Sequence, residues 1–162
     1  MITGNGDIAS VLPERDDLHF FASGVSNSQE TRESEYEREI ELLSLQDMGE
    51  HIVYFSTLAL FYGNSRYVDH KWQMEALTKA WFPKHTIIRL GNIVWGDNPY
   101  TLINHLIAHP EAVIRDEWRY VVDKDEFLHW VNLIPSWSCE MNVPGRRMKV
   151  KDIKKEFVDA QG

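Results

Sequence analysis

Three short apolar runs constrain the fold of this chain most strongly. They occupy residues 18–22, 52–55 and 86–90, and each is rich in aromatic or β-branched side chains. Runs of this length without polar alternation are typical of strands buried on both faces of a parallel sheet. The intervals between them carry helical patterns, and strands that alternate with helices form α/β folds. The sequence therefore predicts a parallel sheet with helices on both faces.

The interval between the first two runs predicts an amphipathic helix. Residues 30–47 are rich in acids, while Tyr36, Ile40 and Leu43 recur at helical spacing on one side. A helix with one apolar side packs on a core and keeps its charged face in water. We therefore interpret the acids as a solvated face.

The rest of the chain predicts four further helices and a strand. An apolar helix is expected through Phe127, Leu128 and Val131. One helix is expected to begin near Ser65 and to end before Pro83, because proline cannot continue a helix. Pro99 is expected to open another helix. Residues 139–143 are expected to form a short strand, and Val150 to open a closing helix.

Composition limits the functions open to the chain. Its 162 residues are 43% hydrophobic and 26% charged, as in an ordinary soluble domain. A formal net charge of -8 argues against binding to phosphate backbones, so no nucleic-acid partner is expected. Cys139 is the single cysteine, and the sequence contains neither a signal peptide nor an apolar run of about 20 residues. We expect a cytoplasmic protein without a membrane partner.

No metal site is predicted. His105 and His109 have the one-turn spacing of a helical metal pair. A structural or catalytic zinc site needs at least a third protein ligand, and the sequence offers none nearby. We interpret both as surface or capping histidines.

The run at 52–55 leads into the residues with the clearest chemistry. It ends in Ser56 and Thr57, and the helix that follows carries Tyr67 and Lys71. Residues four apart lie about one helical turn apart on the same face. A nearby cation stabilises a phenolate and lowers the tyrosine pKa, so that the tyrosine can exchange protons at working pH. The hydroxyls can hold a carbonyl or alcohol oxygen beside it, although the pair by itself is more typical of two residues on the surface of a helix.

Tyr62 offers a competing register. With Arg66 it forms a Tyr-x-x-x-Arg pattern in the same region. An arginine stays charged but lacks the compact ammonium of lysine. We therefore prefer Tyr67.

A glycine-containing turn lies near the beginning of the sequence. Apolar residues lead into Gly4-x-Gly6-x-x-Ala9. A strand that feeds such a turn presents backbone N–H groups and a helix N-terminus to a pyrophosphate. The helix here can hardly pass Pro13. A plain glycine turn is the alternative.

Taken in order, these features resemble the extended branch of the short-chain dehydrogenase/reductase superfamily, the NAD-dependent sugar-nucleotide epimerases, dehydratases and reductases. The matching residues are the strand-end hydroxyls, Tyr67, Lys71, Glu75, the segment Arg89-x-x-Asn92 with Gly96, and the glycine turn. The resemblance implies a single Rossmann-like α/β domain over residues 1–162, with a reduced parallel sheet and a small substrate-side part in about 96–162.

The resemblance also implies an activity. A member of this family uses NAD or NADP to act on a carbonyl or secondary alcohol, here of a nucleotide-linked sugar. Tyr67 would exchange a proton with the reacting oxygen, and Lys71 would lower the pKa of Tyr67 and hold the nicotinamide ribose. Ser56 or Thr57 would hydrogen-bond the same oxygen, and Thr57 is preferred because it lies further toward the strand end.

Further residues are assigned to the ligands by the same resemblance. Asn92 and Arg119 would hold the substrate, although Arg119 capping a strand is an equal alternative. The cofactor-binding residues implied are Gly4, Gly6, Ala9, Ala22, Ser23 and Lys71.

The chain departs from the family in its N-terminal third. The usual second and third strands are missing, and the glycine turn is one residue short. No acidic residue can be assigned to the adenosine ribose, a contact that normally follows the second strand. The alternative function is therefore a non-catalytic binding or regulatory module descended from the family. Because missing strands expose a sheet edge, and because the chain has 6 tryptophans, a homodimer is expected.

Overall fold

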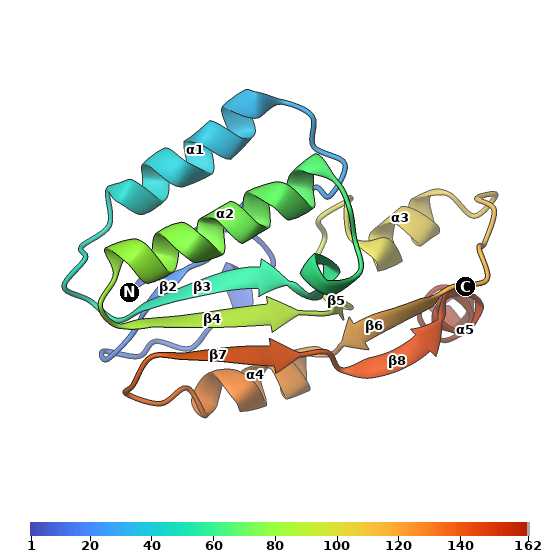
Figure 1. Ribbon diagram of the computed structural model, residues 1–162. Coiled ribbons are helices and arrows are strands. Elements are labelled where there is room, and N and C mark those ends of the chain that lie inside the picture. The colour runs from blue at the N-terminus through green and yellow to red at the C-terminus, as the bar shows by residue number, and fades with distance from the viewer. Residues whose placement is uncertain (162) are drawn as a thin grey trace.

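The computed structural model describes residues 1–161, and its centre is a five-stranded sheet in which every strand runs parallel to its neighbours (Figure 1). The strands lie in the order β1-β2-β3-β4-β7. They span Ile2–Thr3 (β1), His19–Phe21 (β2), Ile52–Thr57 (β3), His85–Leu90 (β4) and Cys139–Val143 (β7). The predicted strands are confirmed, and the carboxyl ends of parallel strands meet at one edge of the sheet.

Helices cover both faces of this sheet, as the sequence predicted. Helices α1 (Glu33–Ser44) and α2 (Arg66–Trp81) lie on one face, and α4 (Lys124–Asn132) lies on the other (Figure 1). Successive side chains of β3 point alternately toward the two faces. Its Tyr54 packs in the core beneath α1 and α2, whereas Phe55 packs in the core beneath α4.

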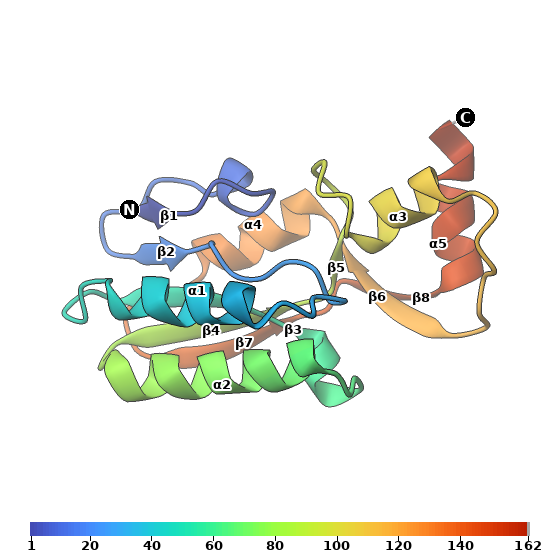
Figure 2. The same cartoon turned by 90° about the horizontal axis from the view of Figure 1, so that it is seen from above.

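Strand β1 is an edge of the sheet, and the connection that follows it is very short (Figure 2). The helix expected after the glycine turn is wrong, because the chain forms only a three-residue 3-10 turn, Ala9–Val11. Few residues separate β1 from β2, and Pro13 follows closely without an N–H to extend a helix. The turn therefore lacks the N-terminus of an α-helix.

A second, three-stranded sheet lies beyond the carboxyl edge of the first. It consists of β5 (Asn92–Ile93), β6 (Trp118–Val122) and β8 (Arg146–Lys149), with β8 antiparallel to β6. Helices α3 (Leu102–Ala108) and α5 (Val150–Phe157) accompany it, followed by a 3-10 turn at Asp159–Gln161 (Figures 1 and 2). Strand β8 was not predicted.

Two boundaries differ from the expectation. Helix α3 begins after Thr101, whose hydroxyl accepts the N–H of Asn104, so Pro99 lies in the preceding turn instead of opening the helix. The substrate-side part is also interrupted, because α4 and β7 follow residue 96 yet pack on or join the main sheet. Within residues 1–161, no helix has the length and apolar character needed to cross a bilayer.

Candidate functional site

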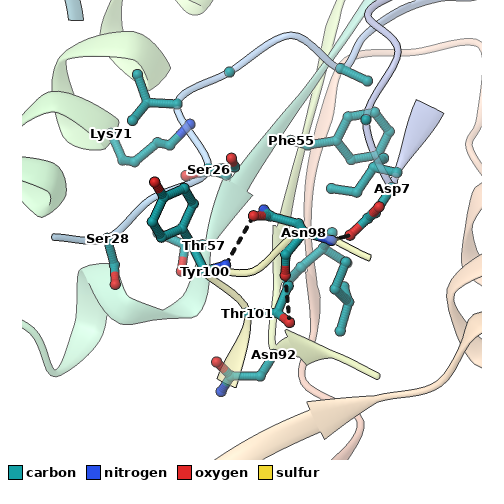
Figure 3. A pocket seen from close by; sticks show the side chains of 18 of the residues that line it. Asp7, Ser26, Ser28, Phe55, Thr57, Lys71, Asn92, Asn98, Tyr100 and Thr101 are labelled. Carbon is teal, nitrogen blue, oxygen red and sulfur yellow. Dashed lines mark hydrogen bonds between the residues drawn. The ribbon is translucent and has the colours of Figure 1, made fainter. Parts of the chain in front are cut away.

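A cavity of about 650 Å³ opens at the carboxyl edge of the main sheet. Its walls come from the ends of β2, β3 and β4, the start of α2, the glycine turn and β6. Lys71 and Asp7 lie on opposite sides of it (Figure 3). The predicted residues on its wall are Gly6, Ala22, Ser23, Ser56, Thr57, Tyr67, Lys71, Asn92 and Arg119. Gly4 and Ala9 lie outside the wall.

The two hydroxyls at the end of β3 are in different environments. Thr57 caps the 3-10 turn Leu58–Phe61, and its Oγ1 accepts the N–H of Ala59 at 3.1 Å. Ser56 is buried, and its Oγ has no hydrogen-bond partner among residues 1–161. A buried hydroxyl without a partner is uncommon in folded proteins. Ser56 therefore has hydrogen-bonding capacity to spare at the cavity wall.

The first turns of α2 bring Tyr67 and Lys71 to the same wall. Ser65 begins the helix by accepting the N–H of Val68 at 3.2 Å, which is a conventional N-cap. Lys71 Nζ lies 5.6 Å from the centre of the Tyr67 ring. The one-turn spacing in the sequence thus places a phenol and an ammonium side by side.

Lys71 is engaged by two other groups as well. Its ammonium donates to the Tyr54 hydroxyl at 3.0 Å and to Glu39 Oε1 at 3.4 Å. Glu39 comes from α1, and its side chain is fully buried. Lys71 therefore has a buried carboxylate as its counter-ion.

Glu39 accepts hydrogen bonds from four residues, which lie on α2, on β3 and in the loop after β2. Besides Lys71, its donors are the Val25 N–H at 2.6 Å, the Tyr54 hydroxyl at 2.5 Å and His70 Nε2 at 3.2 Å. Because the carboxylate can only accept, His70 carries its proton on Nε2, and its Nδ1 has no partner in the described chain. Burial alone would raise the pKa of Glu39, but Lys71 and these hydrogen bonds lower it to about 2.

The environment of Tyr67 opposes ionisation in this structure. Burial raises the pKa of Tyr67, and the negative charge of Glu39 adds to the rise, while a hydrogen bond with Thr57 works against it. The resemblance implied that Lys71 lowers the pKa of Tyr67, but this pKa is raised in the structure. The physical reason is that burial disfavours the phenolate and the negative charge of Glu39 disfavours it further, so Tyr67 keeps its proton at neutral pH.

The two glycines of the turn have different roles. Gly4 has a φ of +124°, and a Cβ there would overlap the carbonyl oxygen of Ala22. Gly4 is thus required for the close packing of the ends of β1 and β2. A Cβ on Gly6 would meet no atom within 4 Å, so this backbone borders open space at the cavity.

Asp7 joins the turn to the opposite rim of the cavity. Its carboxylate accepts the N–H groups of Asp97 at 3.2 Å and Asn98 at 3.0 Å, and its carbonyl accepts Trp95 Nε1–H at 3.0 Å (Figure 3). A carboxylate beside the turn repels a pyrophosphate, which is also anionic. The donors that satisfy Asp7 reduce this opposition without removing it.

The proposed substrate residues are partly occupied by protein contacts. Asn92 Nδ2 donates to the carbonyl of Tyr120 at 2.9 Å, which leaves its Oδ1 for a ligand. Arg119 pairs with Glu117 at 3.0 Å on the cavity rim. Both residues can contact a ligand. Asn92 also binds β6, and Arg119 also binds Glu117 just before that strand.

Glu75 and Arg89, two further residues of the resemblance, form a buried ion pair. Arg89 donates to the Glu75 carboxylate at 2.6 and 3.0 Å. A paired, hydrogen-bonded geometry of this kind binds α2 to the end of β4. These two residues support the site from behind the wall.

No protein-family model matches the chain, and no curated protein matches its sequence. Solved structures do match it. A dTDP-4-dehydrorhamnose reductase of Clostridium acetobutylicum has a TM-score of 0.67 at 15% identity, over 90% of this chain and 62% of that one. The Bordetella bronchiseptica enzyme WbmG in complex with NAD has a TM-score of 0.63 at 15% identity, over 90% of this chain and 56% of that one.

A third structure is the UDP-glucose 4-epimerase of Thermotoga maritima with UDP-glucose, with a TM-score of 0.62 at 16% identity, over 86% of this chain and 59% of that one. This chain shares the fold of these three enzymes over most of its length. This chain spans 56% to 62% of the length of these three solved chains. Among residues 1–161, no strand lies beyond β1, at the edge where the resemblance implied two further strands.

Sequence reasoning missed Glu39 and Asp7. Glu39 lies three residues after Tyr36 and four before Leu43, on the apolar side of its helix, and an acid at such a position indicates a buried partner. Asp7 had no comparable pattern, because its partners are 90 and 91 positions away. No group of three His, Cys, Asp or Glu residues arranged to hold a metal occurs in the part of the chain described.

Proposed function

We propose that the chain is an NAD(P)-dependent reductase or epimerase that acts on a carbonyl or secondary alcohol of a nucleotide-linked sugar. One observation carries the proposal: Thr57, Tyr67 and Lys71 line one cavity at the carboxyl edge of a parallel sheet. Ligands of open α/β folds bind at this edge. Enzymes of the same fold have been crystallised with NAD, NADP and UDP-glucose.

The proposed chemistry is proton exchange with the reacting oxygen. Tyr67 carries its proton at neutral pH and donates it to a substrate carbonyl. Thr57 and Ser56 hydrogen-bond the same oxygen, and the free capacity of the Ser56 hydroxyl supports this. The bound dinucleotide supplies the hydride, while the chain positions the groups around it.

The residues present fit the nicotinamide end of a dinucleotide. Lys71 would hold the nicotinamide ribose, with Ala22 and Ser23 as the neighbouring wall. The open space at Gly6 allows a phosphate to approach the backbone closely. The adenosine end is different, because β1 is the edge of the sheet and Asp7 stands at the turn.

Asn92 and Arg119 are the proposed substrate contacts. The Asn92 carboxamide oxygen is free to accept a sugar hydroxyl, and the Arg119 guanidinium can bind a phosphate of a nucleotide-linked sugar. The position of both residues on the same wall as Tyr67 supports this assignment.

A non-catalytic binding or regulatory module is the second candidate. It is favoured by the carboxylate of Asp7 at the glycine turn and by the absence of a strand beyond β1 in residues 1–161. Both features weaken the binding of a whole dinucleotide.

Nicotinamide fluorescence tests the proposal. NADH, NADPH and reduced nicotinamide mononucleotide are titrated into the protein, and turnover is then assayed with nucleotide-linked 4-keto sugars. We expect the mononucleotide to bind within a few-fold of NADH, because the adenosine end has few contacts. Turnover that Tyr67→Phe abolishes supports the enzyme. If none of the three nicotinamide compounds binds, the non-catalytic module replaces it.

A further inference from the structure

Glu39 is the most deeply buried charged group next to the proposed site, and no motif assigns it a role. It is one of several buried ionisable residues, and among residues 1–161 it is the one carboxylate that pairs with Lys71. Isolated charges are costly to bury, so a buried carboxylate is retained only with partners that satisfy it. The position of its carboxylate, which reaches from α1 to the first turns of α2, therefore calls for an explanation.

The geometry fixes the ammonium of Lys71 in place. One of its hydrogen bonds goes to Glu39 and another to Tyr54, so two of its three N–H directions are determined by buried groups. The loop after β2 closes over the pair: a Cβ on Gly24 would lie 2.8 Å from Lys71 Nζ and 3.1 Å from Glu39 Oε1. The loop at Gly24 therefore lies directly against the Lys71–Glu39 pair.

The same geometry sets the charges around Tyr67. Lys71 lies one turn along α2 with its Nζ 5.6 Å from the centre of the Tyr67 ring, and Glu39, on α1, hydrogen-bonds that ammonium. Thr57, at the end of β3, hydrogen-bonds Tyr67, and Tyr62 follows the 3-10 turn after that strand. Among these four, only Lys71 and Glu39 carry a charge at neutral pH, and their signs are opposite. Burial holds the pKa of Tyr67 high, and the balance between these two charges adds to that effect or opposes it.

We propose that Glu39 is a positioning residue of this site, which fixes the Lys71 ammonium against Tyr54 and offsets its charge beside Tyr67. The catalytic meaning of this inference rests on the proposed function. The ionisation of Tyr67 itself does not depend on turnover. A merely structural Glu39, joining α1 to α2, would contribute to stability and leave that ionisation unchanged.

The test replaces Tyr67 with 3,5-difluorotyrosine, a near-isosteric phenol that ionises near neutral pH, and follows its ionisation by ¹⁹F NMR. The measurement is made in the otherwise unchanged protein and in Glu39→Gln, which keeps the shape of the side chain and removes its charge. We expect Glu39→Gln to lower the ionisation pH by at least about 1 unit, the usual effect of one nearby charge. An unchanged or higher ionisation pH would overturn the proposal.

Lys71→Met is the matched variant of opposite sign. It leaves Glu39 without its counter-ion, so we expect the ionisation pH of the difluorotyrosine to rise. The ionisation pH of the double variant, which also carries Glu39→Gln, should lie between the values of the two single variants. These arms remain decisive if Glu39→Gln alone proves unstable. In a turnover assay, Glu39→Gln should move the pH profile in the same direction as the ¹⁹F titration. If the protein turns over no substrate, the proposed function fails, and the ¹⁹F shifts still decide the role of Glu39.

Discussion

The buried carboxylate of Glu39 makes the stability of the protein depend on pH in a predictable way. Its pKa is lowered from the ordinary value of 4.5 to about 2 in the folded chain, since Lys71 and the hydrogen bonds to it outweigh the effect of burial. A group with a depressed folded-state pKa contributes stability above its unfolded-state pKa. That contribution is lost as the pH falls through the folded-state value.

The size of the effect follows from the two pKa values. The difference between 4.5 and about 2 is worth about 3 kcal/mol, present in full above pH 4.5. At pH 3 about 2 kcal/mol of this is already lost, because the unfolded chain is mostly protonated there and the folded chain is not. This loss is a large share of the usual free energy of unfolding of a domain, which is about 5 to 15 kcal/mol.

Urea unfolding at pH 7 and pH 3, followed by tryptophan fluorescence, measures this contribution. We expect the unchanged protein to lose about 2 kcal/mol more between the two pH values than Glu39→Gln does. Lys71→Met should also reduce the loss of unfolding free energy between pH 7 and pH 3, because Glu39 then lacks its positive partner. Other carboxyls whose pKa is lowered by a hydrogen-bonded Arg or Lys are common to both proteins and cancel: Asp17, Glu30, Glu33, Asp116 and Glu140. Equal losses in the two proteins would refute the reasoning.

Four further outcomes are expected. Tyr67→Phe should lower kcat by about 10² to 10⁴ and leave dinucleotide affinity nearly unchanged, whereas Tyr62→Phe should retain activity; the reverse pattern would show that the chosen register is wrong. Lys71→Met should weaken NADH binding by about tenfold, the equivalent of one charged hydrogen bond of about 1.5 kcal/mol, as fluorescence titration can measure. Gly4→Ala should lower the free energy of unfolding by about 2 kcal/mol or more, because φ is +124° and the Cβ meets backbone. Gly6→Ala is its matched control and should change stability by less than about 0.5 kcal/mol, so equal losses in urea unfolding would contradict the assignment. The chain should also self-associate, most simply as a two-fold dimer, and a monomeric mass by light scattering at micromolar concentration would count against this.

The main sheet could be predicted because its signals are local. Each central strand is a continuous apolar run, and its flanking helices carry their own caps and stops, such as Ser65 at the start of α2. Strand β8 could not be found in this way. Its sequence, Arg146 to Lys149, has little apolar content, and it becomes a strand only by pairing with β6.

The candidate site was predictable to the same extent. Spacing along one helix placed Lys71 beside Tyr67, and parallel topology brought the strand ends together. The pKa of Tyr67 was not predictable, because it depends on Glu39, a residue 28 positions away on another helix. Local patterns report which side chains share a face, whereas electrostatic balance depends on contacts between elements.

The hydrogen bonds of Asp7 bear on the order in which the protein assembles during synthesis. Strand β1 has two residues and a single neighbour, so it cannot hold its own turn in place. The groups that fix the turn, Trp95 and Asn98, follow 88 and 91 positions later and emerge from the ribosome correspondingly late. Because the contact also closes a loop of 91 positions, we expect the amide of Asn98 to gain protection from hydrogen exchange late in refolding as well. The cavity wall at the Asp7 turn is therefore complete only after the segment that contains Trp95 and Asn98 has been synthesised.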